Sequence, residues 1–125
     1  MELTLTQEFL LLILWRMKCT SRFRYVKSKK VVIQFFTELD NYVCDSYFTV
    51  VQELYDLART RKFEVPLVDG LGNIGDTSDP EYMEGANPKY TEVALSEAGV
   101  EYILAHGYDK ITCYELMSKL DIFFT

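Results

Sequence analysis

The stretch from residue 69 to residue 88 breaks the regular patterns of this chain and most constrains how it can fold. It contains four Gly, two Pro and two Asn, which favour turns over helices and strands. Strand-like residues precede it, at 63–68, and resume after it, at 89–95. We therefore expect a long loop that joins two strands within one domain, and not a linker between two domains.

Helical patterns occupy most of the remaining chain, because apolar residues recur there at helical spacing behind capping residues. Thr6, Ser28 and Ser96 are predicted to open three helices, and either Asp45 or Ser46 is predicted to cap another. Residues 20–26 alternate aromatic with basic side chains, which is the pattern of a short strand. The predicted helices cover residues 6–17, 28–39, 46–60, 96–104 and about 111–123, with a turn at 40–42.

The predicted helix over 46–60 has two different faces. We expect the inward face to carry Phe48, Val51, Leu54, Tyr55 and Ala58. The outward face is expected to carry Tyr47, Thr49, Val50, Gln52, Glu53 and Asp56.

Composition limits the classes of protein that this chain can belong to. The 125 residues are 49% apolar and 26% charged, which predicts one globular domain over residues 1–125. The longest apolar run, Phe9 to Trp15, is far short of the ~20 residues that a membrane span needs. Three widely spaced Cys without a CxxC pair favour a reducing, cytoplasmic location. A single His leaves little for catalysis, so we expect a non-enzymatic protein without a cofactor.

Charge is divided unevenly along the chain. Residues 1–37 carry seven basic and two acidic side chains, whereas residues 38–125 carry six basic and seventeen acidic ones. A basic segment of this kind predicts a patch that faces phosphates. The alternative is a solvated surface whose charges are offset in space by the acidic part.

The order helix, strand, helix, helix, strand, long loop, strand, helix, helix resembles that of a winged helix-turn-helix domain. The junction Leu95-Ser96-Glu97-Ala98-Gly99 also resembles the start of the helix that follows the wing in winged-helix regulators. The resemblance implies an α+β fold with a long acidic wing and an extra C-terminal helix. It also implies that the helix over 46–60 enters the major groove of duplex DNA.

Ten side chains are predicted to contact DNA on this interpretation. Basic residues would hold phosphates, Gln52 could pair with adenine, and Thr49 could contact a base or a phosphate. Glu53 and Asp56 would face phosphates unfavourably. The predicted DNA-binding residues are Arg22, Arg24, Lys27, Lys29, Lys30, Ser46, Tyr47, Thr49, Gln52 and Lys89.

The predicted wing carries the opposite charge. Between Glu64 and Glu84 there are six acidic residues and no basic one, so phosphates would repel this loop unless it points away. It could instead dock a basic protein partner. Asp76, Asp79 and Glu81 are hard oxygen ligands, but their spacing is not that of an EF-hand, and no metal site is predicted.

A second resemblance covers residues 66–96. The segment Pro66-Leu67-Val68-Asp69-Gly70-Leu71-Gly72-Asn73-Ile74-Gly75, followed by Lys89-Tyr90-Thr91-Glu92, is similar to the DNA-cleavage (A) subunit of bacterial gyrase and topoisomerase IV. The resemblance implies that Tyr90 is a nucleophile toward DNA. This chain has Lys89 where the family has Arg, and Asp40-Asn41-Tyr42 where it has His-Pro-His. The alternative is that Tyr90 is a half-buried aromatic residue of the wing strand.

The prediction for function is a non-enzymatic winged-helix protein that binds double-stranded DNA. A small transcriptional regulator, or a phage or mobile-element accessory protein, would fit. The alternatives are a protein-interaction module that does not bind DNA and a degenerate topoisomerase cleavage domain that uses Tyr90. The apolar residues of the helix at about 111–123 predict a homodimer through that helix, or a helix that closes the core of the monomer.

Overall fold

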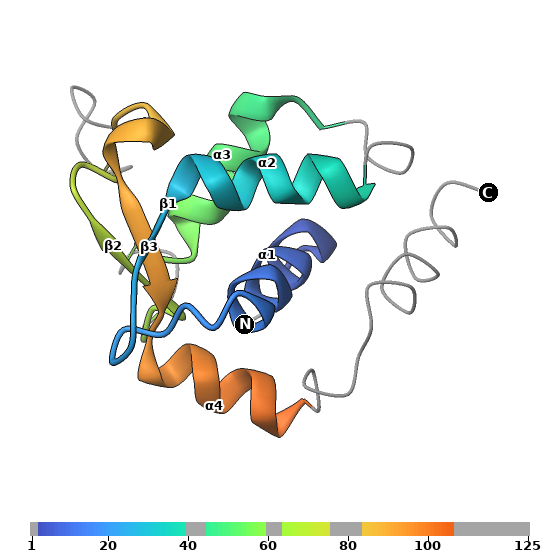
Figure 1. The fold of residues 1–125 in the computed structure, drawn as a ribbon, viewed down its shortest axis with the longest axis vertical. Helices are drawn as coiled ribbons and strands as arrows, with labels where there is room; N and C mark the ends of the chain where they lie inside the picture. Colours follow the sequence, from blue (N-terminus) through green and yellow to red (C-terminus); the bar gives the residue numbers. More distant parts are fainter. Residues whose placement is uncertain (1–2, 40–44, 60–63, 76–83, 107–125) are drawn as a thin grey trace.

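The computed structural model describes residues 3–39, 45–59, 64–75 and 84–106, and within these ranges the fold is α+β, as predicted. The described ranges contain four α-helices and one 3-10 helix beside a small antiparallel sheet (Figure 1). The elements are α1 (Leu5–Arg16), β1 (Val26–Lys27), α2 (Ser28–Leu39), α3 (Tyr47–Asp56), β2 (Val68–Leu71), η1 (Pro88–Tyr90), β3 (Glu92–Leu95) and α4 (Glu97–Ala105).

The sheet has the strand order β1-β3-β2, so that β3 is its central strand. Lys27 of β1 pairs with Glu92 at the start of β3, and Leu71 of β2 pairs with the same residue from the other side. The helices lie on one side of the sheet, and α1 lies among α2, α3, α4 and β3 (Figure 1). This antiparallel register determines which loop side chains meet at each end of the sheet.

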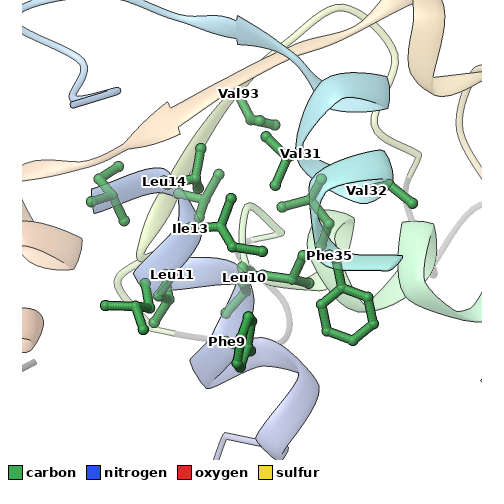
Figure 2. Close-up of a cluster of buried hydrophobic side chains, with 14 of the residues drawn as sticks. Phe9, Leu10, Leu11, Ile13, Leu14, Val31, Val32, Phe35 and Val93 are labelled. Carbon is green, nitrogen blue, oxygen red and sulfur yellow. The ribbon is translucent and has the colours of Figure 1, made fainter. Parts of the chain in front are cut away.

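Helix α1 forms the centre of the core because it is apolar on nearly all sides. The residues from Phe9 to Leu14 are all buried, and the Phe9 ring meets Phe35 of α2 edge to face at 6.0 Å (Figure 2). Thr4, and not the predicted Thr6, caps this helix. The Thr4 side chain accepts a hydrogen bond from the backbone of Gln7, whose side chain accepts one from Thr4 in return.

The predicted strand boundaries are wrong in three places. Residues 20–24 form a turn, because the amides of Phe23 and Arg24 both donate to the Thr20 carbonyl, and Phe23 is 73% exposed instead of buried in a strand. Strand β2 begins at Val68, where the prediction ended it. The segment at 88–90 forms η1, so β3 starts only at Glu92.

The apolar face of α3 also differs from the prediction. Val50 is completely buried, although it was expected on the outward face, whereas Phe48 is 54% exposed. Of the two predicted caps, Ser46 is the one that forms, since its hydroxyl accepts the amide of Thr49 at 3.2 Å. The helix ends at Asp56, four residues earlier than the predicted end at Thr60.

Helix α4 is capped by Ser96, as predicted, and the same hydroxyl donates to the Pro66 carbonyl at 2.7 Å. Gly99 permits this close packing, because a β-carbon there would lie 2.1 Å from the Leu67 carbonyl oxygen. The predicted turn at 40–42 and the predicted helix at about 111–123 lie outside the described residues. None of the helices in the described ranges is long and apolar enough to cross a membrane.

Candidate nucleic-acid interface

The short helix η1 presents two side chains at the surface from a well-anchored turn. The side-chain oxygen of Asn87 accepts the amide of Lys89 at 3.0 Å, and its carbonyl accepts the amide of Tyr90 at 2.9 Å. Pro88 and Thr91, on either side of the exposed pair, are both buried. Lys89 and Tyr90 therefore project from a turn whose two ends are fixed in the fold.

Thr91 fixes this turn to two helices. Its hydroxyl donates to the Ser28 hydroxyl at 2.7 Å, and its carbonyl accepts the amide of Ser28 at 3.0 Å. The Tyr55 hydroxyl of α3 lies 2.9 Å from the Thr91 hydroxyl and donates to the Ala86 carbonyl at 2.8 Å. These contacts hold η1 against the first residues of α2 (Figure 1).

The four lysines that this arrangement brings together, Lys27, Lys29, Lys30 and Lys89, are here called the lysine face. All four are exposed, and the first turn of α2 contains no acidic residue. Within the described part of the chain, the ion pairs involve Arg16, Arg22 and Arg59 and none of these lysines. The nearest carboxylate in the sheet register is Glu92, opposite Lys27. The lysine face is therefore strongly cationic.

Tyr90 lies beside Lys89 of the lysine face, in η1 and not in β3. Its side chain is 69% exposed, which corrects the expectation of a half-buried strand residue. The Lys89 ammonium lies 5.1 Å from the centre of the Tyr90 ring, close enough for a cation–π contact. The ring is thus presented to solvent beside a positive charge.

Arg22 and Arg24 do not join the lysine face. Arg22 pairs with Glu97 of α4, and Arg24 donates to the Met17 carbonyl at 2.6 Å. Because β1 runs antiparallel to β3, the turn before β1 lies at the end of β3, whereas the start of α2 lies at its beginning. The predicted basic group is therefore divided between the two ends of the sheet.

Three of the residues predicted to contact DNA, Ser46, Tyr47 and Thr49, lie at the start of α3 and already have contacts within the protein. Ser46 is used as the helix cap, and its hydroxyl lies 3.0 Å from that of Thr49. Tyr47 stacks on Phe36 of α2 with ring centres 6.2 Å apart, and burial raises the pKa of its phenol. All three are nevertheless exposed.

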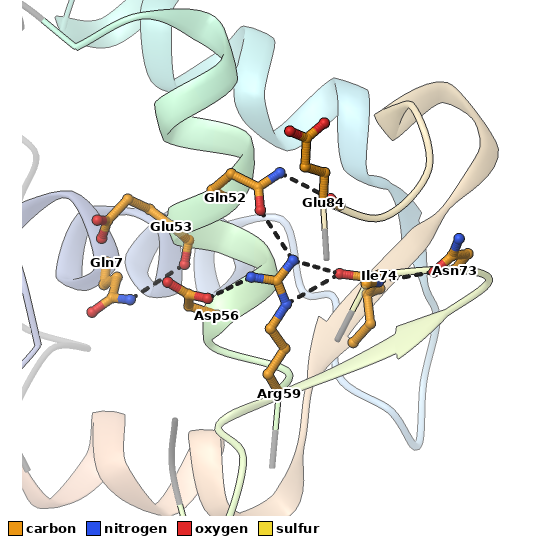
Figure 3. A network of polar contacts seen from close by, with 9 residues as sticks. Gln7, Gln52, Glu53, Asp56, Arg59, Asn73, Ile74 and Glu84 are labelled. Atoms are coloured by element: carbon orange, nitrogen blue, oxygen red, sulfur yellow. Dashed lines mark hydrogen bonds and ion pairs between the residues drawn. The ribbon is translucent and has the colours of Figure 1, made fainter. Parts of the chain in front are cut away.

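Among the remaining polar side chains of α3, Gln52 and Asp56 belong to a network with Arg59 and the long loop (Figure 3). The Glu53 carboxylate instead accepts a hydrogen bond from the Thr4 hydroxyl. The Gln52 amide donates to the Glu84 carbonyl at 2.9 Å and accepts from Arg59 at 3.0 Å. The buried Arg59 guanidinium also donates to the Ile74 carbonyl at 2.9 and 3.2 Å and to Asp56 at 2.6 Å. These side chains, together with Tyr55, hold both ends of the loop against α3.

The prediction that Gln52 pairs with adenine is therefore not supported, because Gln52 would first have to break two internal hydrogen bonds. The network also contains two residues that sequence reasoning missed, Tyr55 and Arg59. Tyr55 was assigned only to the apolar face, and Arg59 was counted only among the six basic side chains of residues 38–125. Both functions depend on a loop more than ten residues away in sequence, and no local pattern indicates that contact.

No group of three metal-ligating side chains occurs in the part of the chain that the structure describes. Asp76, Asp79 and Glu81 lie outside it. Neither a scan against models of protein families nor a search of curated proteins gives a match. The geometry of the lysine face is therefore the main indication of function in the described residues.

Proposed function

We propose that this chain is a non-enzymatic winged-helix domain that binds the phosphate backbone of duplex DNA through its lysine face. The order α1-β1-α2-α3-β2-β3-α4 and the central position of β3 support the winged-helix part of this proposal. The loop between β2 and β3 would be the wing.

The observation that carries the proposal is the group of four exposed lysines around the start of α2. A lysine in the first turn of a helix opposes the helix dipole, at a cost of about 0.3–1 kcal/mol. Lys29 and Lys30 therefore do not serve helix stability. Their charges suit phosphate oxygens, and the free amides at a helix start attract the same anions.

The occupied polar face of α3 determines what kind of DNA binding we propose. Gln52, Asp56 and Arg59 hold the loop, so few side chains are left to read base edges. Binding would be directed at the backbone and would show little sequence preference. Its affinity would fall in the non-specific range, with Kd of about 10⁻⁴ to 10⁻⁶ M at physiological salt.

The formal charge of −6 over the chain does not prevent such binding. Interactions between exposed charges are largely screened beyond about 10 Å at 0.1 M salt. A phosphate in contact with the lysine face would therefore respond mainly to nearby lysines. The rest of the chain would weaken the approach at low salt.

The test is fluorescence anisotropy with random-sequence duplex DNA at several salt concentrations. We expect the double variant Lys29→Gln/Lys30→Gln to bind more weakly, with a salt slope reduced by about 1.8 if both lysines contact phosphates. The matched control is Arg22→Gln/Arg24→Gln, which removes the same charge at the other end of the sheet. That control should keep the slope of the unaltered protein.

Equal effects of the two double variants would contradict the proposal, because only the net charge would then matter. Absence of binding even at low salt would also contradict it. In that case the interaction-module alternative would be tested next by capture of a basic protein partner.

A second candidate function is strand cleavage by Tyr90, which is favoured by the exposure of its phenol beside Lys89. The Tyr90 oxygen would form a bond to phosphorus while one ester bond to deoxyribose breaks. The displaced sugar hydroxyl would take up a proton equivalent to the one that the phenol loses. The described residues hold no group of three metal-ligating side chains, and on this candidate function we expect a partner to supply the carboxylates that bind Mg²⁺.

A covalent protein–DNA product on a denaturing gel, absent for Tyr90→Phe, would support this second candidate. The assay needs labelled DNA and added Mg²⁺. DNA binding without any covalent product would leave backbone binding as the function.

A further inference from the structure

The Tyr90 ring is an exposed aromatic surface on a backbone turn that is fixed in position. The side chain is 69% exposed, while the residues that hold its turn, Pro88 and Thr91, are buried. Hydrogen bonds to Asn87 on one side and Ser28 on the other fix the backbone. Little conformational freedom in the turn would be lost when a ligand meets the ring.

The surroundings of the ring indicate the chemistry of that ligand. Lys89 lies over the ring at 5.1 Å, and the exposed Lys27, Lys29 and Lys30 lie at the start of α2, against which η1 packs. An aromatic face among cations matches the pattern that stacks on nucleic-acid bases while cations bind the adjacent backbone. An apolar protein partner would have no favourable electrostatic interaction with the four lysines.

We infer that the lysine face recognises duplex DNA containing an unpaired base, and that Tyr90 stacks on this base. The inference rests on the proposed function and specifies its substrate class. In a fully paired duplex each base face is covered by its neighbours, so a protein ring has no face to contact. An unpaired base exposes one, and the flanking duplex supplies phosphates for the lysines.

Stacking of this kind predicts a measurable preference. Loss of one base–aromatic contact reduces affinity by roughly 5- to 150-fold. The effect depends on the ring and not on the hydroxyl. Tyr90→Phe should therefore behave like the unaltered protein, whereas Tyr90→Leu should lose the preference.

The experiment measures the binding of four proteins to two DNAs by fluorescence anisotropy. The DNAs are an intact duplex and the same duplex with one extra unpaired adenine on one strand. The proteins are the unaltered chain, Tyr90→Phe, Tyr90→Leu and Phe23→Leu. Phe23 is a matched control because it is 73% exposed but lies in the turn before β1, at the other end of the sheet.

We expect the unaltered chain, Tyr90→Phe and Phe23→Leu to bind the DNA with the unpaired adenine about tenfold more tightly than the intact duplex. Tyr90→Leu should bind both DNAs with the affinity of the intact duplex. Replacing the unpaired adenine by fluorescent 2-aminopurine gives a second readout. Stacking should quench its emission in every protein except Tyr90→Leu.

Three results would overturn the inference while leaving backbone binding intact. They are equal binding of both DNAs by the unaltered chain, a preference that survives in Tyr90→Leu, and an equal loss in Phe23→Leu. Loss of the preference in Tyr90→Phe would also overturn it, since the hydroxyl and not the ring would then be responsible. If neither DNA binds with salt-dependent affinity, the proposed function itself fails.

Discussion

The side chains on the polar face of α3 and those of the lysine face are used differently. Gln52 of α3 and Arg59, three residues beyond the end of that helix, have hydrogen bonds to the backbone of the long loop, and Arg59 is buried. On the lysine face, Lys29 and Lys30 are exposed and take part in none of the ion pairs among the described residues. Groups that hold the fold are costly to remove, whereas exposed unpaired cations are available for a ligand.

The largest loss of stability is expected for Arg59→Met. The substitution leaves Asp56 and the Ile74 carbonyl without their partner in a largely buried site. We expect the free energy of unfolding to fall by about 3 kcal/mol, measured by urea unfolding.

Arg16→Met is the matched control, since the Arg16 side chain is 38% exposed and pairs with Glu38. We expect Arg16→Met to lower the free energy of unfolding by about 0–1 kcal/mol. Equal losses for the two variants would show that the network on α3 does not hold the loop as described.

A smaller effect is expected for Tyr55→Phe. It removes the hydroxyl that donates to Ala86 and contacts Thr91. The expected loss is about 1 kcal/mol at neutral pH, measured by urea unfolding. A loss below the error of that measurement would contradict the anchoring role of Tyr55.

Tyr55 should also make the protein less stable at alkaline pH. Burial raises the pKa of the Tyr55 phenol above its ordinary value of 10.0. The unfolded chain releases this proton first, so the Tyr55 contribution is complete below about pH 10 and is lost as pH rises through the higher folded pKa. When the free energy of unfolding is measured from neutral to alkaline pH, it should therefore fall less steeply in Tyr55→Phe than in the unaltered protein.

The smallest effect on stability is expected for Lys29→Gln/Lys30→Gln. Removing two cations from the first turn of α2 should leave the free energy of unfolding unchanged or raise it by about 0.5 kcal/mol. The same variant should lose DNA affinity, so stability and binding would change in opposite directions. A loss of stability of more than about 1 kcal/mol would instead give these lysines a structural function.

Local chemistry predicted some elements well. Ser46 and Ser96 cap their helices because a hydroxyl and a nearby amide are enough for a cap. The predicted helix over 28–39 forms as α2, and its apolar residues at helical spacing, among them Val31, Val32 and Phe35, are buried. In these cases the interaction lies within one helix or one turn.

Predictions that depend on distant segments were less successful. Phe48 and Val50 exchange their expected exposure, since the packing of α3 on other elements and not its own periodicity decides the buried face. Arg22 and Arg24 separate from the lysines because of the antiparallel register of β1 and β3. Lys89 lies near the other three lysines because Thr91 forms a hydrogen bond with Ser28, sixty-three residues away in sequence.

The most direct test of the account is an NMR titration of the labelled protein with a short random-sequence duplex. It follows the backbone amide signals of both surfaces in one experiment. We predict that the largest shifts occur at residues 27–30 and 89–91, with small changes at Gln52 and Asp56. Shifts centred on α3, with those of the lysine face unchanged, would contradict the assignment of DNA binding to this face.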